Sequence, residues 1–133
     1  MGISQFAYSV RRHLYVPDVI VDFLCHDKTL FIAVENIGSG PAHHVSVSFE
    51  PEISGIHGET MISDLSLFRD LSFLPPGKEI RTPLDPVQEY FDRGAPTQIE
   101  TVIHFKSDTG ASLSRSIAHD LKVHDSTTHT HHH

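Results

Sequence analysis

Short runs of alternating apolar and polar residues dominate the chain. The clearest are His44–Phe49 and Gln98–Lys106, in which every second residue is apolar or small enough to be buried. Side chains alternate between the two faces of a strand, so this period predicts half-buried β-strands. The residues expected to face inward are Val45, Val47 and Phe49 in the first run and Ile99, Thr101, Ile103 and Phe105 in the second.

Further strands are predicted on both sides of these two. Val19–Cys25 is rich in β-branched residues, and Thr29–Asn36 follows it after a short polar turn, a spacing that is typical of a hairpin. The remaining predicted strands are Leu71–Leu74, Glu79–Leu84 and Ser112–Leu121, the last with Leu113 and Ile117 inward. Glu50–Ser66 is predicted to be a long loop with room for a short strand, and Val87–Asp92 a single helical turn.

These segments predict an all-β fold, an immunoglobulin-like antiparallel β-sandwich of about seven strands. No segment has the length and period of a core helix. The predicted organisation is a lead-in over residues 1–16, the sandwich over 17–123, and a disordered His-rich tail over 124–133. The tail is interpreted as a purification remnant or a floppy native end, without a metal-binding role in the cell.

Composition narrows the function classes. The chain has 133 residues and a formal net charge of −7, and its cations are scattered apart from Arg11 and Arg12, so we expect no nucleic-acid partner. The single cysteine, Cys25, is predicted to be a small buried hydrophobe, and the lack of a second cysteine favours a reducing, cytoplasmic compartment. We expect no transmembrane segment, because no apolar run approaches about twenty residues.

One motif adds a family resemblance. Asn36, Gly38, Gly40, Pro41 and Ala42 form an Asn-x-Gly-x-Gly-Pro-Ala pattern between two predicted strands. The glycines are expected to allow positive φ and close backbone approach, and Asn36 to hydrogen-bond the turn. The pattern, with the later turns in Ser72–Glu79 and Phe105–Gly110, resembles the CARDB group of immunoglobulin-like domains in bacterial and archaeal proteins.

That resemblance implies a fold rather than an activity. Such domains are associated with adhesion or cell-surface contacts, and often follow a membrane helix and a basic connector. Arg11 and Arg12 would correspond to that connector, which implies membrane association of a full-length protein. The resemblance implies no catalytic residues.

Candidate chemistry in the sequence is sparse. The adjacent His43 and His44 are expected to point to opposite faces of a strand, so they do not suit one metal ion. His104 is interpreted as an outward strand residue. Glu50 and Glu52 flank Pro51 and are interpreted as surface charges rather than an acid–base pair. We therefore predict no enzyme, no cofactor and no metal site.

Two functional hypotheses remain open. The favoured one is a non-catalytic interaction module, the soluble portion of a membrane-anchored protein, that presents an edge strand or loops to a protein partner. Self-association through a sheet edge is a related expectation. The alternative is a ligand- or metal-sensing domain that uses the loop over residues 50–70. The residues of that loop that suit a ligand are Glu50, Glu52, His57, Glu59, Asp64 and Asp70.

Overall fold

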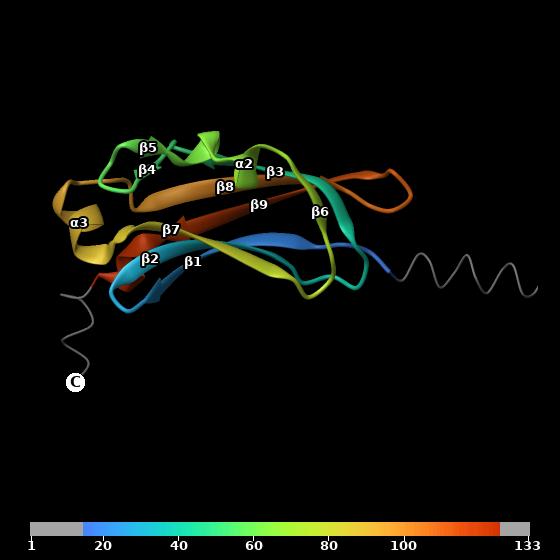
Figure 1. Cartoon of the computed structure of the whole chain (residues 1–133), viewed down its shortest axis with the longest axis horizontal. Coiled ribbons are helices and arrows are strands. Elements are labelled where there is room, and N and C mark those ends of the chain that lie inside the picture. The colour runs from blue at the N-terminus through green and yellow to red at the C-terminus, as the bar shows by residue number, and fades with distance from the viewer. Residues whose placement is uncertain (1–14, 126–133) are drawn as a thin grey trace, which may run out of the picture.

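A computed structural model describes residues 15–125 of the chain, and it is an antiparallel β-sandwich (Figure 1). The main strands are β1 (Val19–His26), β2 (Thr29–Asn36), β3 (Ala42–Glu50), β6 (Leu71–Leu74), β7 (Glu79–Pro86), β8 (Gln98–Lys106) and β9 (Ser112–Asp120). They form a three-stranded sheet in the order β1-β2-β7 and a four-stranded sheet in the order β6-β3-β8-β9. The all-β sandwich prediction is confirmed.

The remaining elements are short. The segment predicted as a loop folds into a two-stranded sheet, followed by a 3-10 turn and a single helical turn. These elements are β4 (Ser54–Gly55), β5 (Thr60–Met61), η1 (Ile62–Asp64) and α2 (Ser66–Arg69). Helix α3 (Val87–Asp92) has the predicted bounds, and η2 (Leu121–His124) ends the described part of the chain. None of the helices formed by residues 15–125 is long and apolar enough to cross a bilayer.

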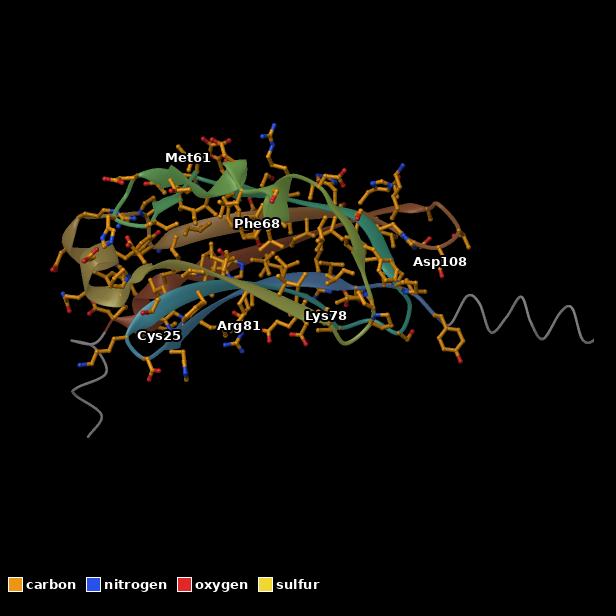
Figure 2. The ribbon with its side chains drawn as sticks, in the orientation of Figure 1. Cys25, Met61, Phe68, Lys78, Arg81 and Asp108 are labelled. Carbon is orange, nitrogen blue, oxygen red and sulfur yellow. The ribbon has the colours of Figure 1, made fainter. Side chains whose placement is uncertain are left out.

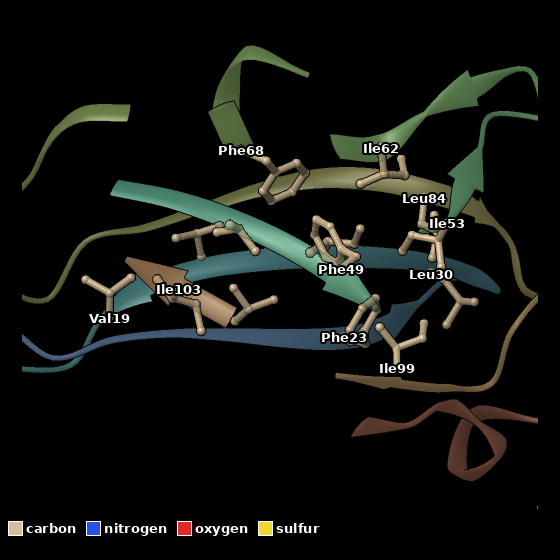
Figure 3. Close-up of a cluster of buried hydrophobic side chains, with 14 of the residues drawn as sticks. Val19, Phe23, Leu30, Phe49, Ile53, Ile62, Phe68, Leu84, Ile99 and Ile103 are labelled. Carbon is tan, nitrogen blue, oxygen red and sulfur yellow. The ribbon is translucent and has the colours of Figure 1, made fainter. Parts of the chain in front are cut away.

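The core lies between the two sheets, and all seven residues expected to face inward on β3 and β8 are buried. Leu113 and Ile117 of β9 are half-buried and pack against this core. Phe68 of α2 closes the core above β3, where its ring meets that of Phe49 edge-on at 5.1 Å between centroids (Figure 3). Edge-on aromatic packing adds to the hydrophobic stabilisation of the burial itself.

The predicted hairpin between the first two strands is confirmed. His26 pairs with Thr29, so that Asp27 and Lys28 alone form the turn, and both have positive φ, 49° and 64°. This backbone twist matches the twist of the flanking strands. Figure 2 shows Cys25 close to this turn. The prediction that Cys25 is buried is wrong, because it lies near the end of an edge strand and its side chain is exposed.

The asparagine of the motif joins three parts of the backbone through four hydrogen bonds. Asn36 is fully buried, and its side-chain oxygen accepts hydrogen bonds from the amides of Asp18 (3.2 Å) and Gly38 (3.0 Å). Its side-chain nitrogen donates to the carbonyls of Gly40 (2.8 Å) and Leu74 (3.0 Å). The carboxamide thus uses both its donors and its acceptor to fasten the entry to β1, the β2–β3 turn and the end of β6.

The two motif glycines are needed for close approach rather than for positive φ, because neither has a positive φ. A Cβ on Gly38 would collide with the carbonyl of Val16, and one on Gly40 with the carbonyl of Tyr15. The chain that leads into β1 therefore lies directly against the turn.

Replacing Asn36 tests this role. We expect Asn36→Ala to lower the free energy of unfolding by about 3 kcal/mol, because four backbone groups lose their partner at a buried position. Urea denaturation measures the change. As a matched control, Gln98→Ala removes an exposed carboxamide and is expected to change stability by less than about 0.5 kcal/mol. Equal stabilities of the two variants would contradict the role assigned to Asn36.

Candidate functional site

The sandwich has four sheet edges, which differ in how they are protected. The three-stranded sheet ends in β1 and β7, and the four-stranded sheet ends in β6 and β9. An unprotected edge strand presents unpaired backbone groups to any other extended chain, and proteins commonly block such edges. The features that cover or interrupt each edge strand therefore determine which backbone groups stay available for pairing.

The edge at β7 is blocked. Pro83 lacks an amide hydrogen, and the carbonyl of Leu84 accepts a hydrogen bond of 2.7 Å from the amide of Ile56 in the β4–β5 turn. A Cβ on Gly55 would collide with that same Leu84 carbonyl, so β4 lies directly against the edge.

The edges at β1 and β6 are also limited. In the middle of β1, the amide of Phe23 donates to the side chain of Asp22 (2.9 Å), and its carbonyl lies 3.0 Å from Nε2 of His124. Strand β6 has four residues and is followed by Pro75 and Pro76. Neither edge offers a long uninterrupted row of backbone groups.

Strand β9 is different, and we call its outer side the open edge. All nine of its residues pair with β8 in one register without a shift, and it contains neither proline nor glycine. Within residues 15–125, no segment hydrogen-bonds to the open edge. The side chains on its outer face are small or short, namely Ser112, Ser114, Ser116, Ala118 and Asp120.

The other face of β9 forms the rim of the sandwich beside β1. Leu113, Ile117 and His119 are half-buried there, and Arg115, which alternates onto the same face, is exposed. Nη1 of Arg115 lies 2.5 Å from Oδ1 of Asp18, so the guanidinium is directed toward the segment before β1. A charged side chain at this position disfavours pairing with a wholly apolar strand, but it leaves the outer backbone groups of β9 available for hydrogen bonds.

His119 lies in a half-buried environment on this rim. Its Nε2 lies 3.1 Å from Oγ1 of Thr101, and its ring meets that of Phe23 edge-on at 4.9 Å between centroids. Burial lowers the pKa of His119, and the nearby carboxylate of Asp22 opposes this shift only in part.

A cluster of polar side chains lies on the other side of the sandwich, beside β7. The 50–70 loop of the metal-sensing hypothesis contributes one residue to it. His57, at the β4–β5 turn, meets Asp85 of β7 and Glu89 of α3. We call these three residues, with Arg93, the polar corner. Nδ1 of His57 lies 2.7 Å from Oε2 of Glu89, and the His57 amide donates to Oδ1 of Asp85 at 3.0 Å.

Arg93 completes the polar corner. Its guanidinium is in ionic contact with Oδ2 of Asp85, donates to the carbonyl of Ser54 at 2.5 Å and lies 5.1 Å from the ring centre of Tyr90. Tyr90 is itself fixed by a hydrogen bond to the carbonyl of Pro96, and burial raises its pKa to about 12. The corner therefore fastens the β4–β5 turn to α3.

The other predicted ligand residues do not converge. Glu52 accepts a hydrogen bond from Ser63, and Asp70 lies 3.4 Å from Nδ1 of His44. The backbone is bulged after His43 rather than regularly extended, and Nε2 of His43 lies 2.6 Å from Asp108. His43 and His44 thus contact different carboxylates, and His104 is exposed on β8 as predicted.

Sequence reasoning missed Asp85 and Glu89, which lie outside the loop considered. An acidic residue inside the apolar stretch Pro83–Val87 was the available signal, since a buried carboxylate needs a partner. The open edge had no such signal, because the neighbours of a strand are not visible in its own residues.

Within residues 15–125, these features define an antiparallel β-sandwich domain with an open edge at β9 and a polar corner beside β7. The chain belongs to a family of domains of unknown function, DUF8453, whose model matches residues 5–125. That match begins inside the predicted lead-in segment. No curated protein matches the chain.

The state of His119 has a measurable consequence. We expect the free energy of unfolding to fall as the pH drops below about 6.5, because the unfolded chain binds a proton on His119 at a higher pH than the folded chain does. Above that pH both states hold a neutral ring and the contribution is constant.

Urea denaturation at a series of pH values measures this dependence. His119→Gln, which cannot titrate in this range, is expected to lose less stability on acidification than the unaltered chain. Superimposable pH profiles of the two proteins would rule out the contribution of His119.

Proposed function

We propose that the domain is a non-catalytic interaction module that binds an extended segment of a protein partner along the open edge. The observation that carries this proposal is the contrast among the edges. Strands β1, β6 and β7 are interrupted or covered. Strand β9 offers nine residues of regular backbone whose outer side pairs with no segment of residues 15–125.

Strand addition would use two kinds of contact. Hydrogen bonds between the backbones provide affinity, and alternate side chains of the added strand provide specificity. One set of side chains of the added strand would lie beside Ser112, Ser114 and Ser116, whose small side chains leave room for it. The other set would lie at the rim beside Leu113 and Ile117, which favours apolar residues, with an acidic residue preferred near Arg115.

A peptide-display selection of extended segments against the full chain tests the proposal. We expect Ser114→Lys to weaken binding of the selected peptides by about tenfold or more, because lysine on an edge strand opposes further pairing. Fluorescence anisotropy of labelled peptides measures the affinities, and amide hydrogen exchange is expected to show new protection on β9.

The matched control is His104→Lys. Residue 104 is exposed, lies directly opposite Ser114 in the register and belongs to β8, which has paired strands on both sides. The His104→Lys substitution adds a lysine to the same sheet face as Ser114→Lys does, but on a strand away from the open edge. Equal losses in both variants, or protection that avoids β9, would contradict strand addition.

A second copy of the chain is the related occupant of the same edge. Sedimentation at increasing protein concentration distinguishes the two cases. Self-association that Ser114→Lys abolishes would identify the partner as another copy of this domain.

A further inference from the structure

The polar corner brings together three side chains that ligate metals, from three separate elements. One imidazole nitrogen of His57 and one carboxylate oxygen each of Asp85 and Glu89 all lie within 4.8 Å of one another. These residues come from the β4–β5 turn, the end of β7 and the first part of α3. Their sequence separations, 28 residues between His57 and Asp85 and 32 between His57 and Glu89, show that the fold itself assembles the group.

Asp85 is the unusual member of this group. Its side chain is fully buried, and Oδ2 makes no hydrogen bond although the guanidinium of Arg93 is in ionic contact with it. Its other oxygen, Oδ1, accepts the His57 amide. A carboxylate oxygen has two lone pairs, so an oxygen that accepts one N–H can also bind an ion.

The charge around the corner favours a cation. His57, Glu89, Asp92 and Arg93 line a surface depression, and the buried Asp85 contacts two of them, Arg93 and the amide of His57. The depression and the buried carboxylate next to it thus hold three carboxylates, Asp85, Glu89 and Asp92, and one guanidinium. Arg93 is held on its own side by the carbonyl of Ser54 and the ring of Tyr90, where it acts on Asp85 as a positioning residue.

We propose that His57, Asp85 and Glu89 bind a divalent transition-metal ion of the zinc class. Imidazole and carboxylate ligands suit Zn²⁺, whereas Ca²⁺ takes six to eight oxygen ligands, more than this corner supplies. His57 and Glu89 are exposed by more than a third, so a fourth ligand position opens to solvent. This site shares no residue with the open edge. Of the 50–70 loop it uses only His57, at the β4–β5 turn, and its other two ligands, Asp85 and Glu89, lie outside that loop.

Zinc titration of the full chain tests the proposal. To remove competing ligands, the tail histidines 129, 131, 132 and 133 are replaced by alanine in every protein used. We expect one equivalent of Zn²⁺ to bind in isothermal titration calorimetry and to raise Tm saturably, because an ion that binds only the folded state stabilises it. Co²⁺ is expected to give visible absorption bands of a site with nitrogen and oxygen ligands.

Two exposed ligands are varied, so that folding is preserved. His57→Ala and Glu89→Gln are each expected to weaken Zn²⁺ binding by about tenfold or more. His44→Ala is the matched control, since His44 is also exposed and lies beside a carboxylate, Asp70, but outside the polar corner. Circular dichroism confirms that each variant is folded.

Absence of Zn²⁺ binding at millimolar concentration in the tail-substituted chain would overturn the proposal. Binding that survives both His57→Ala and Glu89→Gln, or that His44→Ala weakens equally, would also overturn it. Peptide binding at the open edge is measured separately with chelator present, so failure of one site is distinguishable from failure of the other.

Discussion

The carboxamide of Asn36 is the contact on which the rest of the fold depends. At one end of the sandwich, the entry to β1, the turn between β2 and β3 and the end of β6 all approach within hydrogen-bonding distance of this single buried side chain. The backbone of Asn36 also bonds to the β6–β7 turn, through the amide of Gly77 and the carbonyl of Lys78. Buried backbone groups need such partners, so one residue keeps three loops in fixed relation.

The position of these loops decides which strands become edges. Next to Asn36 the chain leaves β6 in the four-stranded sheet and enters β7 in the three-stranded sheet. The β4–β5 turn then lies against β7, while on the other side β1 packs over β8 and β9. The passage from β6 to β7 thus places a shielded edge at β7 on one side of the sandwich and leaves the edge at β9 on the other. The exposed backbone of β9 follows from this topology rather than from its own residues.

Local patterns in the sequence predicted local structure well. The alternation around Val47 and Ile103, the turn at Asp27 and Lys28 and the bonding of Asn36 to its turn are all properties of neighbouring residues, and the structure confirms them. Cys25 was predicted wrongly because the apolar pattern of a strand does not reveal that it is an edge. The polar corner as a group was not predictable, because His57 meets Asp85 and Glu89 only after the sandwich has folded, although an acidic residue in an apolar stretch marked Asp85 itself.

The two candidate sites rely on different physical interactions. Backbone pairing at β9 would use neutral dipoles, whose contribution changes little with ionic strength, and the exposed serines add no charge to it. The polar corner holds two carboxylates and one guanidinium, with Asp85 removed from solvent, so binding of an ion there would be governed by charge. Because β9 lies beside β1 and the corner lies against β7, occupation of one site does not require the other to be empty. The two proposed sites therefore share no residue and lie on opposite sides of the sandwich.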